Sequence, residues 1–530
     1  MTETLVDRLR PVGRRLRANL SHSVAIDTRS LAVFRMILGA VVIADVFLRA
    51  RNFTFFYTDD GVVPGSFAME LTADTAFSIF YFTTNPVVIA ALFGLTAVVG
   101  LQLLIGYRST LATVLALLLV VSMDHHNPLV LSYADTLFRL LLFWGIFLPL
   151  GERWSIDALH TESTPRASIS SVASALALSQ MVYMYFMNWY HKSDDELWTS
   201  GEATPLIMGL DDTTFLLGEF TRNFPTLLEY GGLTWYYMLA FSWLLIFLAG
   251  RKRMLLVAMF MAGHASFALT VRIGAFAYVA IAGLTLFLQA QFWDDLDSFR
   301  ARLGVDRSLV DDLIDRLSAF GRRVPYRRVD SARLDLLRSG AYLAGITVVV
   351  GVIVVMAAGA YSPTVGDSLE SSGIETQIEN GADTLSISQP TWTVFAPTPR
   401  TQDSYYVFPA TTDDGQAVDL YNDRELTFDR PHDALQKQYT TYRERFYMNS
   451  IRRGGLDDRH DAPHYLAEHL CAEWNATHDS ELTHVNMYHV TEFVTNETID
   501  DHENRDTRTR QLYRHGCGDS EPTDIDVSTP

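Results

Sequence analysis

The chain has 530 residues, of which 48% are hydrophobic, and its formal net charge of -19 comes from 61 acidic and 42 basic side chains. Residues 362–530 hold 31 of the acidic and 13 of the basic side chains, so residues 1–361 are nearly neutral. The first part is therefore apolar and charge-balanced, and the second is an acidic soluble module. Neither has the net positive field that attracts phosphates, which excludes nucleic acid as a partner. Lysine occurs only at Lys192, Lys252 and Lys437, and an acidic module so poor in lysine predicts a high-salt, halophilic habitat.

Apolar stretches recur along the first part of the chain. A bilayer core of about 30 Å needs roughly 20 mostly apolar residues per helix. We predict a polytopic α-helical membrane protein with about nine transmembrane helices and a C-terminal soluble α+β domain. The predicted spans are residues 30–50, 86–106, 109–124, 134–151, 171–191, 230–250, 254–272, 274–292 and 340–361. The third is short and runs into polar residues, so we expect it to tilt or to end in a protein-lined cavity.

Arginine placement predicts the orientation, because short cytoplasmic loops retain Lys and Arg. Arginines gather in residues 1–29, 251–253 and 293–339, and an odd number of spans puts all three on the cytoplasmic side. We therefore expect a multi-pass protein of the cell membrane, with a cytoplasmic N-terminus and an extracellular C-terminal domain. The predicted organisation is an N-terminal segment (1–29), a bundle of about eight helices (30–292), an amphipathic cytoplasmic connector (293–339), a ninth transmembrane helix (340–361), a linker (362–385) and an extracytoplasmic acidic domain (386–530).

The acidic domain mixes strand and helix signals. Residues 404–412 and 416–422 flank an Asp-Asp-Gly turn and predict a hairpin, while residues 432–450 and 461–475 have helical periodicity. The two cysteines, Cys471 and Cys517, either form a disulfide in an oxidising exterior or remain free thiols; a disulfide would stabilise the domain by about 3 to 4 kcal/mol.

Charged side chains within predicted spans require partners, an aqueous cavity or a function. Asp135 and Arg139 are four residues apart, a spacing that favours an internal ion pair. Arg35, near the cytoplasmic end of the first span, either extends to the interface or anchors a neighbouring helix.

Residues 181–201 carry the fifth span into the exterior loop, and there His191 and Lys192 precede three carboxylates and Trp198. Desolvation at an apolar boundary lowers the pKa of a lysine and can yield a neutral amine able to act as a base. Spacing alone favours the simpler interpretation, a solvated Lys192 paired with the carboxylates.

Two histidine positions are further candidates. His264 lies near the middle of the seventh span, where a histidine serves as a helix-to-helix hydrogen-bond partner or as a proton-transfer group. His125 and His126 end the third span, but adjacent histidines point to different faces of a helix, so we predict no metal site.

The membrane part resembles the horizontally transferred transmembrane domain (HTTM) family, which is related to the vitamin K-dependent gamma-glutamyl carboxylase. The residues that carry the resemblance run in order along the chain. They are Phe34, Arg35 and Gly39; Asn127 and Pro128; Asp135; Arg153 to Asp157; Lys192, Trp198 and Gly201; His264; and Trp392, Phe395, Ala396 and Pro397.

The resemblance implies a chemistry. In the carboxylase, a lysine at the lumenal end of a membrane helix deprotonates reduced vitamin K, oxygen then adds, and the resulting base removes a proton from glutamate before carbon dioxide is captured. Here the resemblance implies Lys192 as base, with His264 and His191 as further catalytic residues, a reduced menaquinone-type quinone as cofactor and a peptide or protein substrate on the exterior side. Arg35, Asn127, Asp135 and Trp198 are the expected cofactor-binding residues.

Two other functions compete with a quinol-dependent carboxylase or related enzyme. One is a non-enzymatic, membrane-anchored binding or scaffolding protein that displays the acidic domain and uses Lys192 as an interfacial ion-pair residue. The other is a transporter, against which the spans show neither a two-half repeat nor matching broken helices.

Overall fold

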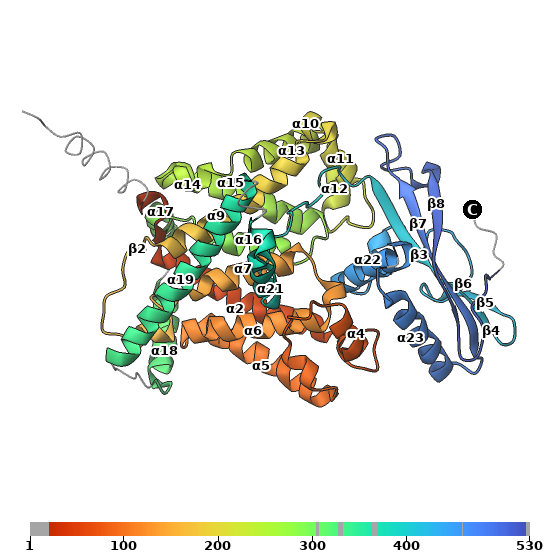
Figure 1. Ribbon diagram of the computed structural model, residues 1–530. Coiled ribbons are helices and arrows are strands. Elements are labelled where there is room, and N and C mark those ends of the chain that lie inside the picture. Colours follow the sequence, from red (N-terminus) through yellow and green to blue (C-terminus); the bar gives the residue numbers. More distant parts are fainter. Residues whose placement is uncertain (1–20, 304–306, 327–331, 363–367, 458, 526–530) are drawn as a thin grey trace, which may run out of the picture.

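The computed structural model describes residues 21–303, 307–326, 332–362, 368–457 and 459–525. A bundle of helices forms one end of the molecule and a β-sheet with two helices forms the other (Figure 1). The arginines predicted to mark a cytoplasmic N-terminus at positions 8 to 17 lie outside the described residues.

Long helices build the bundle, and each begins with a recognisable signal. Asp27 caps the first of them through the backbone N–H of Arg29, while Ser132 with Asp135 forms a capping box at the start of another. The longer helices are α2 Thr28–Ala50, α5 Pro86–Ile105, α6 Ser109–His126, α7 Tyr133–Ile146, α9 Val172–Lys192, α13 Pro225–Ala240, α15 Gly250–Thr270 and α16 Phe276–Thr285.

Short elements fill the ends of the bundle. They are β1 Ile26–Asp27, which pairs with β2 Ser168–Ile169, and the helical turns α3 Phe53–Tyr57, α4 Gly65–Glu70, η1 Ile79–Phe82, η2 Pro128–Val130, α8 Ile156–Leu159, α10 Glu196–Ser200, α11 Ala203–Met208, α12 Gly218–Arg222 and α14 Leu244–Phe247.

Close backbone contact holds α2 against α5. A Cβ atom added to Gly39 of α2 would lie 2.4 Å from the backbone nitrogen of Leu104. Only glycine permits this approach. The close packing therefore explains why glycine stands at position 39, one of the positions that carry the family resemblance.

Among the described residues, five helices are long and apolar enough to cross a membrane, and a sixth span results if the bent pair α16 and α17 Ala290–Arg302 counts as one. The five comprise α2, α5, α6, α15 and residues Leu336–Gly359 of α19 Ala332–Tyr361. Large apolar side chains such as Phe82, Val87 and Leu255 are exposed around the bundle, as a surface that faces lipid requires. All nine predicted spans overlap helices, although α7, α13 and α16 are shorter than a full span.

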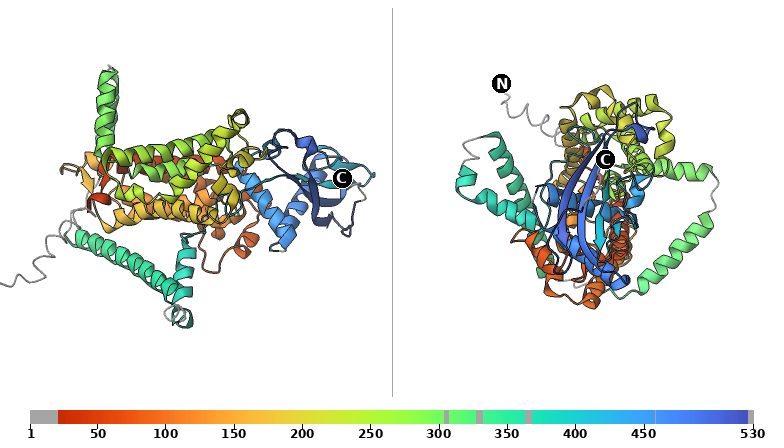
Figure 2. Two further views of the ribbon diagram at one scale, coloured as in Figure 1. Left: turned by 90° about the horizontal axis from the view of Figure 1, so that it is seen from above. Right: turned by 90° about the vertical axis from the view of Figure 1, so that its right-hand side faces the viewer.

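The predicted connector does contain helices, α17 Ala290–Arg302 and α18 Arg307–Arg323. Figure 2 shows α19 running beside the bundle rather than within it, and only 6% of its most apolar stretch is buried. The segment predicted as a linker is not wholly extended, because Ile374–Thr384 forms helix α21.

The C-terminal module, described over residues 386–457 and 459–525, is an antiparallel sheet covered by helices. Its strands are β3 Gln402–Val407, β4 Pro409–Thr412, β5 Ala417–Asp419, β6 Arg424–Glu425, β7 Leu482–Phe493 and β8 Thr507–Gly516; its helices are η3 Leu435–Gln438, α22 Tyr442–Asp457, α23 Ala462–Thr477 and η4 His502–Asn504. The strand order is β3-β7-β4-β5-β6, with β8 also paired to β7. The hairpin prediction is confirmed by the pairing of β4 with β5.

Of two further predictions for the module, the structure corrects the start of a helix and decides whether the two cysteines are bonded. The first predicted helix begins at Tyr442 rather than at residue 432, since the preceding residues form only the 3-10 turn η3. Cys471 of α23 and Cys517 form a disulfide, which settles the two alternatives that the sequence left open. This bond ties α23 to the end of β8.

One continuous apolar core joins the module to the bundle. α22 lies between the sheet and the bundle (Figure 1), and the rings of Tyr447 in α22 and Phe56 in α3 pack edge to face with centroids 5.2 Å apart. The Oγ of Ser450 donates a hydrogen bond to the carbonyl oxygen of Leu129, 2.9 Å away. The module is therefore docked on the bundle rather than tethered loosely to it.

Candidate active site

A cavity of about 630 Å³ lies where the bundle meets the C-terminal module. Its walls come from α9, α13 and α15 of the bundle, from residues 392–395 and from α22. The wall is largely aromatic and aliphatic, and the polar groups that reach it are few. Such a concave, mostly apolar space with a few convergent polar groups is typical of small-molecule sites.

One face of α9 supplies three of the polar groups. Tyr185, Asn188 and Lys192 are spaced by three and four residues, which places them on the same side of the helix, and all three line the cavity. The amide nitrogen of Asn188 donates to the carbonyl oxygens of Trp392 and Val394, at 2.8 and 3.0 Å. The α9 face therefore holds the segment that enters the C-terminal module.

Lys192 is only 2% exposed. Its Nζ donates to the carbonyl oxygens of Val394 and Phe395, at 2.8 and 2.9 Å, and lies 3.5 Å from the ring centroid of Trp198. No carboxylate forms an ion pair with it among the described residues. The three acidic residues that follow it in sequence are exposed or half-buried, so they do not hold the amine in solvent.

The segment around Trp392 is conformationally strained. Trp392 has φ +55° and Phe395 has φ +51°, a region that large side chains rarely adopt. The Trp392 ring is fully buried and stacks on Tyr133, with centroids 5.7 Å apart. Such strain persists only where the surroundings over-determine the backbone, and the hydrogen bonds from α9 supply that restraint.

His264 faces the same cavity from α15 and is 1% exposed. Its Nε2 lies 2.8 Å from the hydroxyl oxygen of Tyr185, whereas its Nδ1 has no hydrogen-bond partner among the residues that the structure describes. The ring of Trp235 packs edge to face against it, with centroids 5.3 Å apart. An unpartnered buried ring nitrogen beside a cavity can accept from or donate to a ligand there.

The structure brings Lys192, His264 and Trp198 to one cavity but leaves the other candidates elsewhere. His191 is half-buried and does not line it, and its Nε2 has no partner. Arg35 is fully buried near the opposite end of α2, where its Nη2 donates to the carbonyl oxygen of Trp154 at 2.6 Å. It anchors a neighbouring segment there, one of the two alternatives that the sequence offered.

Asn127 has a local structural contact rather than a place at the cavity. Its Nδ2 donates to the carbonyl oxygen of Phe56 at 3.1 Å, and its Oδ1 accepts from the backbone N–H of Leu129. The amide therefore fixes the turn between α6 and η2 against α3.

The prediction of an ion pair between Asp135 and Arg139 is wrong. Arg139 pairs with Asp124, while Asp135 accepts from Arg443 of α22, with Nη2 and Oδ1 2.8 Å apart, and does not line the cavity. Helical spacing allowed the pair, but each side chain meets an opposite charge on another element instead. The polar end of α6 thus belongs to a buried charge network beside the cavity and not to the cavity itself.

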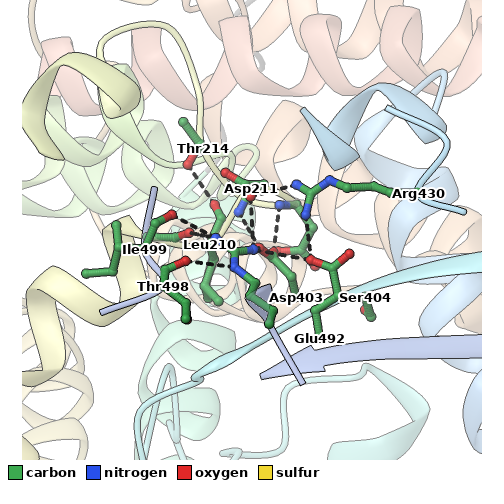
Figure 3. Close-up of polar contacts among 12 residues, drawn as sticks. Leu210, Asp211, Thr214, Asp403, Ser404, Arg430, Glu492, Thr498 and Ile499 are labelled. Carbon is green, nitrogen blue, oxygen red and sulfur yellow. Dashed lines mark hydrogen bonds and ion pairs between the residues drawn. The ribbon is translucent and has the colours of Figure 1, made fainter. Parts of the chain in front are cut away.

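A second buried network fastens the module to the loop after α11 (Figure 3). Arg430 donates to Asp211, with Nη2 and Oδ2 2.6 Å apart, and also to Glu492. Arg505, fully buried, donates to Asp403 at 2.8 Å between Nη1 and Oδ2. Each of these buried charges contacts a group of opposite charge, so we interpret the network as a structural connection between the module and the bundle. Within the described ranges, no group of three or more His, Cys, Asp or Glu side chains is placed to hold a metal ion.

Sequence reasoning missed several residues that line the cavity. Tyr185 and Asn188 could have been found, since they share the Lys192 face at helical spacing. Arg445 and Phe446 could not have been found in this way. They belong to the C-terminal module, more than 150 residues along the chain from the part of the wall that α9 and α15 form.

These features define a helical membrane protein with a docked C-terminal module and a cavity between the two parts. Residues 24–293 match the HTTM domain, half of the chain, and the protein therefore belongs to the HTTM family. No curated protein and no solved structure gives a significant match to the chain.

Proposed function

We propose that the cavity is the site of a quinol-dependent enzyme related to the gamma-glutamyl carboxylases, with Lys192 as the base. The observation that carries the proposal is that Lys192 and the Tyr185–His264 pair face one apolar cavity, with no carboxylate paired to the amine within the described part of the chain. Candidate general bases occur where a titratable group is desolvated beside a ligand-sized space.

The proposal includes an outward-facing site. With about nine membrane passes, the arginine-rich segments lie in the cytoplasm and Lys192, at the end of α9, lies toward the exterior. The C-terminal module then sits outside the cell membrane and covers the cavity. The Cys471–Cys517 disulfide supports an oxidising location for the module.

The residues present fit a quinol head group. The volume of about 630 Å³ lies within the roughly 300–1,000 Å³ typical of small-molecule sites. Trp198 Nε1 and His264 Nδ1 are buried without hydrogen-bond partners in the part of the chain that the structure describes, and both residues line the cavity. These two atoms and the Lys192 amine are the groups that would meet the ring oxygens, while Trp235 and Phe276 would stack on the ring.

The side chains around the cavity would bind the quinol, move protons and exclude water. In its neutral form the amine of Lys192 can accept a proton at Nζ, and the carbonyl oxygens of Val394 and Phe395 orient it. His264 and Tyr185 form a hydrogen-bonded relay at 2.8 Å, and the aromatic wall excludes water. A bound quinol would supply an ionisable hydroxyl and the two electrons that reduce dioxygen, and that oxidation would drive the removal of the proton from glutamate before carbon dioxide adds to a peptide or protein on the exterior side.

Quinone binding by purified protein in high salt tests the proposal through quenching of tryptophan fluorescence. Lys192→Met should weaken menaquinol-analogue binding by about tenfold or more, because a hydrogen bond to the amine is lost. His264→Phe, which keeps an aromatic ring, should weaken it less. Lys437→Met, at an exposed lysine of the module, is the matched control. Absence of saturable binding by folded wild type would refute the quinol site.

One observation favours a second function, display of the module by a non-enzymatic scaffold. The contact of the Lys192 amine with the Trp198 face and two carbonyl oxygens is also what a structural anchor makes. On that alternative, Lys192→Met lowers thermal stability and leaves quinone affinity unchanged, so the same variant separates the two functions.

A further inference from the structure

Two arginines that no part of the proposed chemistry uses face the cavity. Arg272 follows α15 and Arg445 lies in α22, so one comes from the bundle and the other from the C-terminal module. Both line the cavity that Lys192 and His264 also line. A mostly apolar cavity with two arginines in its wall is electrostatically suited to a ligand with a negative charge.

Neither guanidinium is well satisfied by the protein. The Nη1 of Arg272 donates to the carbonyl oxygen of Gln436 at 2.7 Å, and no carboxylate forms an ion pair with this arginine in the described part of the chain. Arg445 reaches Asp212 only at 3.5 Å between Nη2 and Oδ2, and the same carboxylate oxygen has a closer contact with Arg400. The Nε of Arg445 is buried and has no hydrogen-bond partner within the described ranges. An anion between the two arginines would supply the missing acceptors.

The cavity also reaches the apolar surface of the bundle between α13 and α15. Leu227 and Gly231 of α13 and Met259 and Ser266 of α15 line it, yet all four are exposed, Leu227 by 68% and Met259 by 39%. A Cβ atom added to Gly231 would meet no atom within 4 Å. α15 is one of the five described helices suited to crossing the membrane, so an opening between α13 and α15 would face acyl chains.

We propose that this cavity takes an amphiphile with an acidic head group, a long-chain carboxylate or phosphate. The head group contacts Arg272 and Arg445, and the chain extends between α13 and α15 into the surrounding lipid. The inference goes beyond the quinol proposal and does not need Lys192.

Brominated lipids test this directly, because bromine quenches the cavity tryptophans. The probes are 9,10-dibromostearate and the neutral 9,10-dibromostearyl alcohol, titrated into the full-length protein in detergent at high salt. Wild type should bind the acid about tenfold or more tightly than the alcohol. Arg272→Gln and Arg445→Gln should each reduce that preference severalfold, whereas Arg510→Gln, at an exposed arginine of β8, should preserve it.

Two further arms test the entry side and the ligand class. Gly231→Leu should slow and weaken binding of both probes, while Gly94→Leu, at an equally open glycine of α5, should not. Butyrate, which has the carboxylate but no chain, should fail to displace dibromostearate at equal concentration. Displacement by butyrate, equal binding of acid and alcohol, or an unchanged preference in both arginine variants would each overturn the inference. Neither probe is a quinol and no quinone is present in this titration, so failure here and failure of the quinol site remain distinguishable.

Discussion

Replacing Arg443 with methionine should loosen the docking of the C-terminal module on the bundle. Arg443 of α22 inserts its guanidinium between Asp45 of α2 and Asp135 of α7, with Nη2 2.8 Å from Oδ1 of Asp135. All three side chains are at most 13% exposed. Methionine keeps the length and removes the charge, so the two carboxylates lose a shared partner in a buried site.

The magnitude follows from the burial and from the partner that remains. Removing one member of a buried ion pair costs about 3–5 kcal/mol, because the other charge stays buried without compensation. Arg49 also contacts Asp45 and Asp135, at 2.8 and 3.4 Å, so the lower end applies. About 3 kcal/mol corresponds to roughly a hundredfold shift in the equilibrium between docked and undocked states.

Hydrogen–deuterium exchange measured by mass spectrometry reports this shift at α22 and at η2, which face each other across the interface. Both should exchange faster in Arg443→Met, and a second change, Asp135→Asn, should restore part of the protection by removing one uncompensated charge. Arg459→Met is the matched control, since its pair with Asp457 is exposed and contributes about 0–1 kcal/mol. Wild-type exchange at α22 in Arg443→Met would refute the reasoning.

Three further outcomes follow from the structure. Burial beside two arginines lowers the pKa of His489 to about 3. Because a histidine in the unfolded chain binds a proton below about pH 6.5, the free energy of unfolding should fall by about 2 kcal/mol from pH 7 to pH 5. His489→Gln should flatten this pH profile in denaturant titrations. Reduction of Cys471–Cys517 should lower the unfolding free energy of the module by about 3–4 kcal/mol, seen as a lower melting temperature with reductant, and an unchanged transition would contradict this. Tyr185→Phe removes the hydroxyl that contacts His264 but keeps the ring, so quinone affinity should be nearly retained while turnover falls; equal turnover would exclude the relay.

The membrane character of the protein was predictable because it depends on local composition. Hydropathy over about 20 residues identifies apolar helices without any knowledge of packing, and the helices α2, α5, α6, α15 and α19 lie where the sequence placed spans. Helix boundaries in the module were harder to predict from the sequence, since residues 432–441 have helical periodicity but form a 3-10 turn and loop. The long strands β7 and β8 were not predicted, because their pairing joins segments with polar, irregular alternation.

Lys192, His264 and Trp198 were predicted as candidate site residues from their type and from their order along the chain, which carries the family resemblance. The sequence by itself determined that an unusual lysine ends an apolar helix. Only the tertiary structure decided what surrounds that lysine. The carboxylates adjacent in sequence form no ion pair with it, while backbone carbonyls some 200 residues away accept its hydrogen bonds. Likewise Asp135 meets Arg443 rather than Arg139. Hydropathy and helical spacing act within a few turns, whereas ion pairs and cavity walls depend on which distant elements pack together, and that information is not local to any stretch of sequence.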